Sequence, residues 1–195
     1  EEGDLLNAPD VYMDKLAVGP GLPADVIDLA TSATDNVKSV AAAKGKAPAD
    51  INVCVLDRPR HAEIIAALRE AGAAVRLITD GDVAGVIHTA NPADTGIDIY
   101  IGTGGAPEGV LAAAALRCIG GQMQGRLVLR KPEERERAMK MGIEDPDKKF
   151  DLTEMASGDV IFAATGVTDG SMLDGVRIEG GSVTTNTVVM RSATG

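Results

Sequence analysis

The sequence is poor in the residues that build large aromatic cores and covalent cross-links. It has no tryptophan and only two tyrosines, two phenylalanines and two cysteines among its 195 residues. Its core must therefore be built mainly from Ala, Val, Ile, Leu and Met. No apolar run approaches the roughly 18 residues of a membrane span, and no charged-then-apolar signal segment opens the chain. We therefore expect a soluble, cytoplasmic protein without a membrane partner.

The two cysteines give no sign of a disulfide framework. Cys54 in INVCVLD and Cys118 in ALRCIG each lie inside an apolar run, and they are far apart in the sequence. This placement is typical of buried, reduced thiols in a cytosolic protein.

Positive charge is also scarce, with 19 Lys and Arg against 29 Asp and Glu and a net charge of −10. A nucleic-acid surface needs a basic face that neutralises phosphates, so nucleic acid is not expected as a partner. An anionic ligand must instead find a local positive site. Arg and Lys in loops, or a bound metal ion, could provide one.

From residue 51 onward, short apolar runs alternate with helical patterns. The run INVCVL at 51–56 predicts a buried strand, and Ile65 and Leu68 share one face of the helical pattern at 61–72. Such alternation implies right-handed crossovers, so it predicts an α/β fold with a largely parallel or mixed sheet and helices on both faces. Further strands are expected at 74–79, 97–102, 125–130 and 159–164, and further helices at 83–90, 109–118 and 131–142.

The first fifty residues are less regular. The segment 12–25, YMDKLAVGPGLPAD, is broken by Gly and Pro, and the pattern after it predicts a helix that Thr34 or Asp35 caps and Gly45 ends. We therefore expect 1–50 to be a connecting segment with one helix.

The α/β domain is expected to occupy 51–195. Its tail, 175–192, has the alternation and the Gly-Gly turn of a hairpin, which we expect at the edge of the sheet.

Candidate site residues lie in the loops after the strands, where ligands bind in open α/β sheets because loops and helix N-termini converge there. In the loop DRPR, Pro59 fixes the turn, and Arg58 and Arg60 flank it just before a helix. Two guanidinium groups there could hold a phosphate, although the arginines could also pair with surface carboxylates. His61 is more typical of a first-turn helix residue than of a general base.

The next loop places Asp80 and Asp82 on either side of Gly81, a residue that can adopt positive φ. Two carboxylates around one small space can bind sugar hydroxyls or a hard cation. The alternative is a capped turn, in which one of the aspartates is the N-cap of the following helix.

The third loop, GTGGAPE, does not match a nucleotide-binding motif. Pro107 stands where a dinucleotide fingerprint needs its last glycine, and the Gly-Lys-Ser/Thr of a phosphate-binding loop is absent. Pro107 suits the first turn of a helix, and Gly104 and Gly105 allow a close approach of the backbone. Glu108 falls in that first turn, where an ionised carboxylate could bind a metal or simply stabilise the helix.

Two further features carry little functional signal. The helical pattern KPEERERAMK pairs Glu133 with Arg137 and Glu136 with Lys140, which is typical of an exposed helix. His88 has no second histidine near it in the sequence, so a metal site built on it is not expected.

Five segments, in this order and spacing, resemble the class II fructose-1,6-bisphosphatases of bacteria. They are YMDKLAVGP, RPRH, TDGD, GGAPEGV and VIFAATGVTDG, and the resemblance runs from about Asp10 to the end of the chain. The resemblance implies a cytosolic enzyme of gluconeogenesis with a layered α/β fold like that of other sugar phosphatases. It also implies the Mg²⁺- or Mn²⁺-dependent hydrolysis of the 1-phosphate of fructose 1,6-bisphosphate.

The same resemblance implies roles for single residues. Tyr12, the segment Arg58–Arg60, the segment Asp80–Asp82 and Gly105 would bind the substrate, and Glu108 would be a metal ligand. It assigns no catalytic residue within this chain.

One departure from the family pattern limits these expectations. Family members carry an N-terminal part with most of the metal carboxylates and a DGT-type catalytic loop, and this part is absent here. Glu108 alone could not hold the metal. Both ends look cut, since the chain opens without Met and stops after a strand-like run. We therefore expect the C-terminal, substrate-binding part of the enzyme, inactive on its own.

Two alternatives stay open. The chain could be a binding module for phosphorylated sugars, or part of an enzyme that also accepts sedoheptulose 1,7-bisphosphate, because one extra carbon needs only modest room. The family is commonly dimeric or tetrameric, so we expect a homo-oligomer formed together with the missing N-terminal part.

Overall fold

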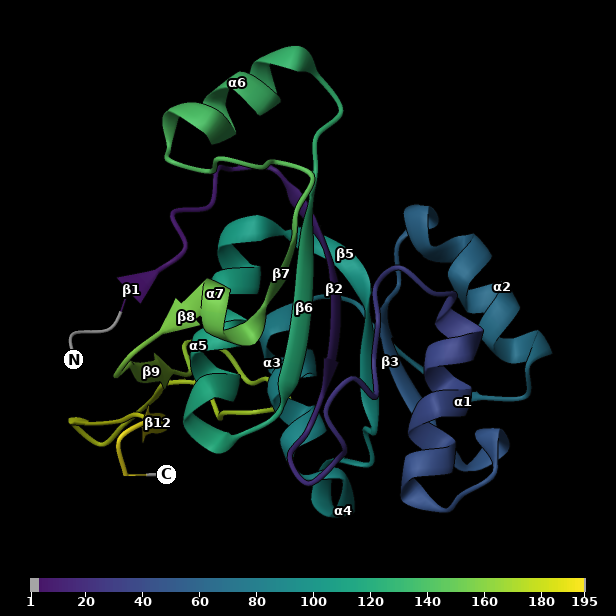
Figure 1. The fold of residues 1–195 in the computed structure, drawn as a ribbon. Helices are drawn as coiled ribbons and strands as arrows, with labels where there is room; N and C mark the ends of the chain where they lie inside the picture. Colours follow the sequence, from purple (N-terminus) through teal and green to yellow (C-terminus); the bar gives the residue numbers. More distant parts are fainter. Residues whose placement is uncertain (1–3, 195) are drawn as a thin grey trace.

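The computed structural model, which describes residues 4–194, is organised around one six-stranded sheet (Figure 1). In spatial order the strands are β4 (Ala74–Ile78), β3 (Asn52–Leu56), β5 (Ile99–Gly105), β2 (Tyr12–Val18), β6 (Gln122–Val128) and β7 (Lys149–Asp151). β3 is parallel to β4 and β5, whereas β2 is antiparallel to β5 and β6, and β7 is antiparallel to β6. The expected α/β fold is confirmed, and its sheet is mixed.

Helices cover both faces of this sheet, as expected (Figure 1). The α-helices are α1 (Ala33–Lys44), α2 (Ala62–Glu70), α3 (Asp82–Ile87), α4 (Pro92–Thr95), α5 (Ala106–Ile119), α6 (Pro132–Lys140) and α7 (Leu152–Met155). The described residues also form three short 3₁₀ helices, η1 (Pro48–Asp50), η2 (Pro59–His61) and η3 (His88–Ala90). α1 and α2 pack on one face, and α3, α5 and α7 pack on the other.

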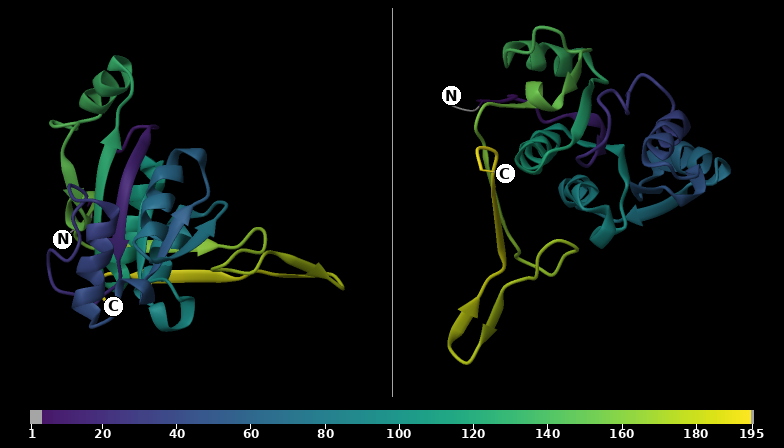
Figure 2. Two further views of the ribbon diagram at one scale, coloured as in Figure 1. Left: turned by 90° about the vertical axis from the view of Figure 1, so that its right-hand side faces the viewer. Right: turned by 60° about the horizontal axis from the view of Figure 1, so that its bottom comes forward.

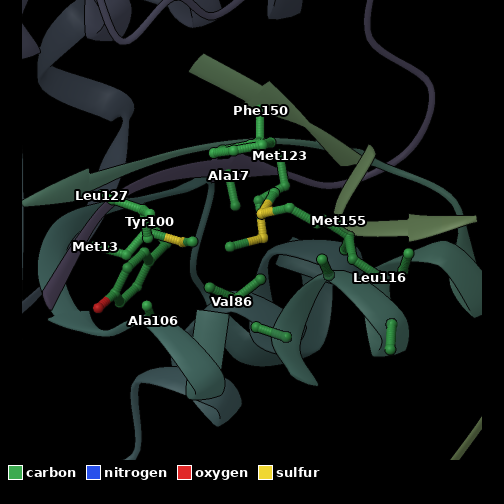
Figure 3. Close-up of a cluster of buried hydrophobic side chains, with 14 of the residues drawn as sticks. Met13, Ala17, Val86, Tyr100, Ala106, Leu116, Met123, Leu127, Phe150 and Met155 are labelled. Carbon is green, nitrogen blue, oxygen red and sulfur yellow. The ribbon is translucent and has the colours of Figure 1, made fainter. Parts of the chain in front are cut away.

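The alternation of side chains along β2 divides the core into two clusters. Leu16 and Val18 join the cluster beneath α1 and α2, whereas Met13 and Ala17 join the cluster beneath α3 and α5. Figure 3 shows this second cluster, in which side chains from the strands face those from the helices. The four alanines at 112–115 of α5 are at most 4% exposed, and their small size lets this helix approach the sheet closely.

The expectation that residues 12–25 form an irregular segment was wrong, because 12–18 are a central strand. A strand covered on both faces carries apolar residues on both, so it shows no clean alternation. Asp14 and Lys15 interrupt its apolar run, and Gly19 and Pro20 end it.

The helix expected after this segment is α1, and its end is as predicted. Gly45 follows it with φ of 63°, in the left-handed region that a C-terminal glycine supplies. The cap at its beginning was placed wrongly. Ser32, and not Thr34 or Asp35, is the N-cap, and its Oγ accepts a hydrogen bond of 3.1 Å from the Asp35 backbone N–H.

The C-terminal arm, residues 161–191, lies outside the six-stranded sheet. Its base pairs β9 (Ile161–Thr165) with β12 (Thr187–Arg191), and its tip pairs β10 (Arg177–Glu179) with β11 (Ser182–Thr184). The hairpin at the tip forms as predicted, and its two turn glycines have φ of 56° and 82°. Its expected place at the edge of the main sheet was wrong, since it projects away from the rest of the molecule (Figure 2).

The base of the arm is packed against α5. Phe162, which is 7% exposed, joins Ala115 and Cys118 of α5 in a small cluster. One further two-stranded pair joins β1 (Asp4–Leu5) to β8 (Ala156–Ser157).

The expectation for the cysteines is confirmed. Cys54 and Cys118 are both buried and unpaired, and burial raises the pKa of the Cys54 thiol to about 11. None of the helices within residues 4–194 combines the length and the apolar character that crossing a membrane requires.

Candidate functional site

The carboxyl ends of β3, β4, β5 and β6 lie at one edge of the sheet, together with the beginning of the antiparallel strand β2. α6 extends from this edge in Figure 1. The register places Tyr12 opposite Gly105 on one side and Val128 on the other. Sequence reasoning placed the candidate residues in loops after strands, and Tyr12 reaches the same edge because its strand runs in the opposite direction.

Arg60 and Tyr12 form the first contact of the candidate site. The Arg60 guanidinium donates from Nε and Nη2 to the Thr103 carbonyl oxygen at 2.9 and 2.7 Å. Its central carbon lies 4.8 Å from the centre of the Tyr12 ring. A guanidinium held in this way has little freedom, and its Nη1 makes no hydrogen bond to any described residue. It is therefore available to an anion.

His61 has a structural role in supporting this arginine. It is fully buried, its Nδ1 lies 2.7 Å from the Leu56 carbonyl oxygen, and its Nε2 accepts a 2.8 Å hydrogen bond from the Thr103 N–H. The Thr103 contact requires Nε2 to be unprotonated, so Nδ1 carries the proton and the ring is neutral. Burial lowers the pKa of His61. With both nitrogens engaged, the ring has no role as a general base, in agreement with the sequence-based interpretation.

Arg58 and Pro59 are placed differently from Arg60. Pro59 begins η2, as a turn-fixing proline should. Arg58 donates from Nη1 to the carbonyl oxygen of Asp57 at 2.9 Å. Its side chain lines a cavity of about 380 Å³ against α2 and β4, and none of its hydrogen bonds within residues 4–194 reaches the groups around Tyr12.

The loop between β4 and α3 separates its two aspartates. Gly81 has φ of 75°, as the sequence allowed, and neither carboxylate caps α3. Asp80 is exposed, whereas the Asp82 side chain is only 12% exposed and forms an ion pair with Lys15. Of the two carboxylates, only Asp82 is therefore directed towards the sheet.

Lys15 is a buried charge in the middle of the central strand β2. Its side chain is 1% exposed, and burial lowers its pKa although Asp82 and Glu108 oppose that shift. A Cβ atom on Gly104 would lie 2.2 Å from Asp82 Oδ2 and 3.1 Å from Lys15 Nζ. Glycine is therefore required at 104, because this ion pair packs directly against the backbone of β5.

Glu108 lies in the first turn of α5, as expected, with Pro107 beside it. A Cβ atom on Gly105 would lie 1.9 Å from Glu108 Oε2, so the carboxylate folds back over the end of β5. The predicted close approach at Gly105 is thus made by a side chain of the protein itself. Glu108 is exposed to solvent.

The described residues do not complete a metal centre. Among residues 4–194, no three His, Cys, Asp or Glu side chains are grouped so that they could hold a metal ion. Asp82 is already paired with Lys15. A hard divalent cation needs about six oxygen ligands, so Glu108 could contribute only one part of such a site.

Several residues of this edge were missed by sequence reasoning. They include Lys15 and Asp14, whose Oδ1 accepts a 2.6 Å hydrogen bond from Thr103 Oγ1. The signal that could have found them is a pair of charges inside an otherwise apolar strand. Tyr100 was missed as well. Its hydroxyl is buried without a hydrogen-bond partner among the described residues, and burial raises its pKa.

Arg130 was the fourth residue missed. It follows β6, and its guanidinium carbon lies 5.3 Å from the centre of the Tyr12 ring. A cavity of about 430 Å³ opens beside it, lined in part by Tyr12, Gly105 and Lys131. A second cavity, of about 470 Å³, lies at the opposite edge of the sheet near Gln122, away from every predicted site residue.

Comparison with known proteins gives a family with the same pattern. The sequence model described as "Bacterial fructose-1,6-bisphosphatase, glpX-encoded" matches residues 1–195. Two similar relatives come from Synechococcus sp. strains JA-2-3B'a(2-13) and JA-3-3Ab, with identities of 46% and 45% over 98% of this chain and 58% of each relative. Another comes from Trichodesmium erythraeum (strain IMS101), with 43% identity over 98% of this chain and 59% of the relative.

All three relatives are named D-fructose 1,6-bisphosphatase class 2/sedoheptulose 1,7-bisphosphatase. The chain spans a little more than half the length of these proteins, with 58–59% of each covered. The match to the family over all 195 residues agrees with the resemblance found in five separate loops. The chain therefore belongs to the glpX-encoded bacterial fructose-1,6-bisphosphatases.

Proposed function

We propose that this chain binds fructose 1,6-bisphosphate for the hydrolysis of its 1-phosphate, which yields fructose 6-phosphate and phosphate in the cytoplasm. The observation that carries the proposal is the guanidinium of Arg60, fixed on Thr103 and stacked on Tyr12 at the loop edge of the sheet. In a chain of net charge −10, a held and partly uncompensated cation is a local site for a phosphate.

The roles proposed for single residues are those that the family resemblance implies. The segment Arg58–Arg60 holds the non-reacting phosphate, with Arg60 nearest to Tyr12. The segment Asp80–Asp82 binds the sugar hydroxyls, and Gly105 marks where the backbone lies closest to the sugar. Binding energy gained at these remote contacts orients the scissile bond.

We propose Glu108 as a ligand for the Mg²⁺ or Mn²⁺ ion that the family resemblance implies. The carboxylates within residues 4–194 form no complete site, so no step of the reaction is assigned to a metal here. The remaining ligands and the catalytic group must lie outside these residues, and we expect the 195-residue chain to release no phosphate by itself.

Calorimetric titration of this chain with fructose 1,6-bisphosphate tests the proposal. We expect saturable binding that Arg60→Ala weakens by about tenfold or more, because one charge-assisted contact is lost. Arg191→Ala, at the base of the arm, is the matched control and should bind like the wild type. Absence of binding by the wild-type chain would contradict the proposal.

Two assays separate the alternatives. Phosphate release measured on the same chain distinguishes a binding module from an enzyme, and appreciable turnover would contradict the missing-ligand argument. Competition between fructose 1,6-bisphosphate and sedoheptulose 1,7-bisphosphate tests dual specificity, which the names of the relatives favour. The homo-oligomer, a dimer or tetramer, remains a proposal that a sedimentation measurement on the full enzyme would test.

A further inference from the structure

A second guanidinium group lies against the Tyr12 ring. Arg60 approaches this ring from the loop after β3 at 4.8 Å, and Arg130 approaches it from the end of β6 at 5.3 Å. The two arginines are 70 positions apart in the sequence, and both are exposed. Cations gathered on one ring repel each other, and a bound anion would relieve that repulsion.

The position of Arg130 is set by its backbone. The carboxylate of Glu134 accepts hydrogen bonds from the backbone N–H groups of Arg130 and Lys131, at 2.6 and 3.1 Å. This contact fixes the turn between β6 and α6 and occupies the N-terminus of that helix. The register of β6 on β2 then places Val128 opposite Tyr12, two residues before Arg130.

The side chain of Arg130, in contrast, has no polar partner. Within residues 4–194 its guanidinium makes no hydrogen bond and no ion pair. Arg135 and Arg177, which are also exposed, are both paired with aspartates. Five N–H donors of Arg130 therefore remain for a ligand.

A space for that ligand lies beside Arg130 and the Tyr12 ring, against which Arg60 also lies. The cavity of about 430 Å³ is lined by Tyr12, Gly105, Arg130 and Lys131, and by the acidic residues Asp10 and Glu134. The carboxylate of Glu134 is engaged with backbone amides. Of the charged side chains that line the cavity, this leaves two cations, Arg130 and Lys131, and one other carboxylate, that of Asp10. Gly105 connects this space to Glu108, the residue proposed next to the reacting phosphate.

We propose that Arg130 is a further substrate-binding residue, which contacts the non-reacting 6-phosphate of the sugar bisphosphate together with Arg60, the other guanidinium that lies against the Tyr12 ring. The inference rests on the proposed function, because it assigns a second cation to the phosphate that Arg60 holds. It makes the end of β6 part of the binding edge, in addition to the loops after β3, β4 and β5. Lys131 adds positive charge to the same end.

Calorimetric titration of the 195-residue chain with three sugars tests this inference. Fructose 1,6-bisphosphate and fructose 6-phosphate carry the 6-phosphate, and fructose 1-phosphate lacks it. We expect Arg130→Ala to weaken binding of the first two by about tenfold and to leave fructose 1-phosphate unchanged. Arg130→Lys should recover part of the loss, because it keeps the charge but not the planar fork.

Arg137→Ala, on the exposed part of α6, removes the same charge a few residues away and is the matched control. If Arg130→Ala binds each of the three sugars as tightly as Arg137→Ala does, the inference is overturned while the proposed function stands. Equal weakening for the three sugars would also overturn it, since a general field effect makes no distinction between phosphates. If the wild-type chain binds none of them, both proposals fall. Thermal unfolding of each variant shows that the fold is kept.

Discussion

The six-stranded sheet and the C-terminal arm both contain strands with apolar residues but are stabilised in different ways. In the sheet, strands such as β2 and β5 bury both of their faces under helices. At the tip of the arm, every residue of β10 and β11 is exposed, including Ile178 at 76% and Val183 at 64%. Apolar burial therefore holds the sheet, whereas the tip depends on backbone hydrogen bonds and a glycine turn.

This difference explains where the candidate site lies. A binding edge needs side chains held by rigid surroundings, and the strand ends of the buried sheet provide them. Arg60, Asp82 and Lys15 are each fixed by a partner from another element. The ion pairs of the arm, such as Arg177 with Asp169, lie in solvent.

The largest expected difference is in the loss of stability when an isoleucine is truncated in the sheet or at the tip of the arm. Ile99 in β5 is fully buried, so Ile99→Ala should lower the free energy of unfolding by about 2–5 kcal/mol through lost apolar contact and a cavity. Ile178→Ala at the tip should change it by less than about 0.5 kcal/mol. Urea unfolding followed by circular dichroism measures both. Similar losses for the two variants would mean that the tip is packed against another surface in solution.

The comparison also shows which parts of the fold could be predicted from sequence. The helices α1 and α5 were foreseen because Gly45, Pro107 and their apolar faces are local signals. β2 was missed because a strand buried on both faces lacks alternation, and the Gly and Pro residues that follow it suggested an irregular segment. The tip hairpin was foreseen from Gly180 and Gly181, but no local signal tells a free hairpin from an edge strand.

The site was predicted in part for the same reason. Arg60, Asp82 and Glu108 lie in the first helical turns after recognisable strands, so the strand-end rule found them. Lys15 contacts Asp82 across 67 positions of sequence, and Arg130 meets Tyr12 only because β6 is the neighbour of β2. Such contacts depend on strand order, which the sequence pattern did not determine.

Two ion pairs extend the comparison from apolar to charged groups. In the sheet, the side chains of Lys15 and Asp82 are 1% and 12% exposed, whereas those of Arg177 and Asp169 in the arm are 54% and 61% exposed. Lys15→Met leaves a mostly buried carboxylate without its partner and should cost about 1–3 kcal/mol of stability. Arg177→Met should cost less than about 0.5 kcal/mol.

A second substitution shows whether the cost comes from the unpaired charge. Because burial lowers the pKa of Lys15, burying this ammonium costs free energy that its acidic neighbours do not fully offset. Adding Asp82→Asn to Lys15→Met should therefore restore most of the lost stability in urea unfolding. No recovery in the double variant would mean that the lysine acts mainly through the packing of its alkyl chain against Gly109.

The smallest effect expected is a pH dependence that originates at His61, beside the sheet, and does not reach the tip of the arm. Burial lowers the pKa of His61, so the unfolded chain takes up a proton below about pH 6.5 that the folded chain resists. The free energy of unfolding should therefore fall as the pH falls below that value. Protonation of Nε2 would also break the hydrogen bond that it accepts from the Thr103 N–H. Thr103 is the residue whose carbonyl oxygen holds Arg60.

Amide hydrogen exchange at about pH 7.5 and about pH 5.5, corrected for intrinsic rates, measures this effect in each region. Protection of β3 and β5 should decrease at the lower pH, and protection of β10 and β11 should not change, because Asp169 near the tip has a lowered pKa and titrates only in stronger acid. His61→Gln should reduce the pH dependence of the sheet without abolishing it, since burial lowers the pKa of His88 as well. An equal loss of protection in the tip would contradict the distinction between the two regions, because both histidines of the chain lie outside β10 and β11.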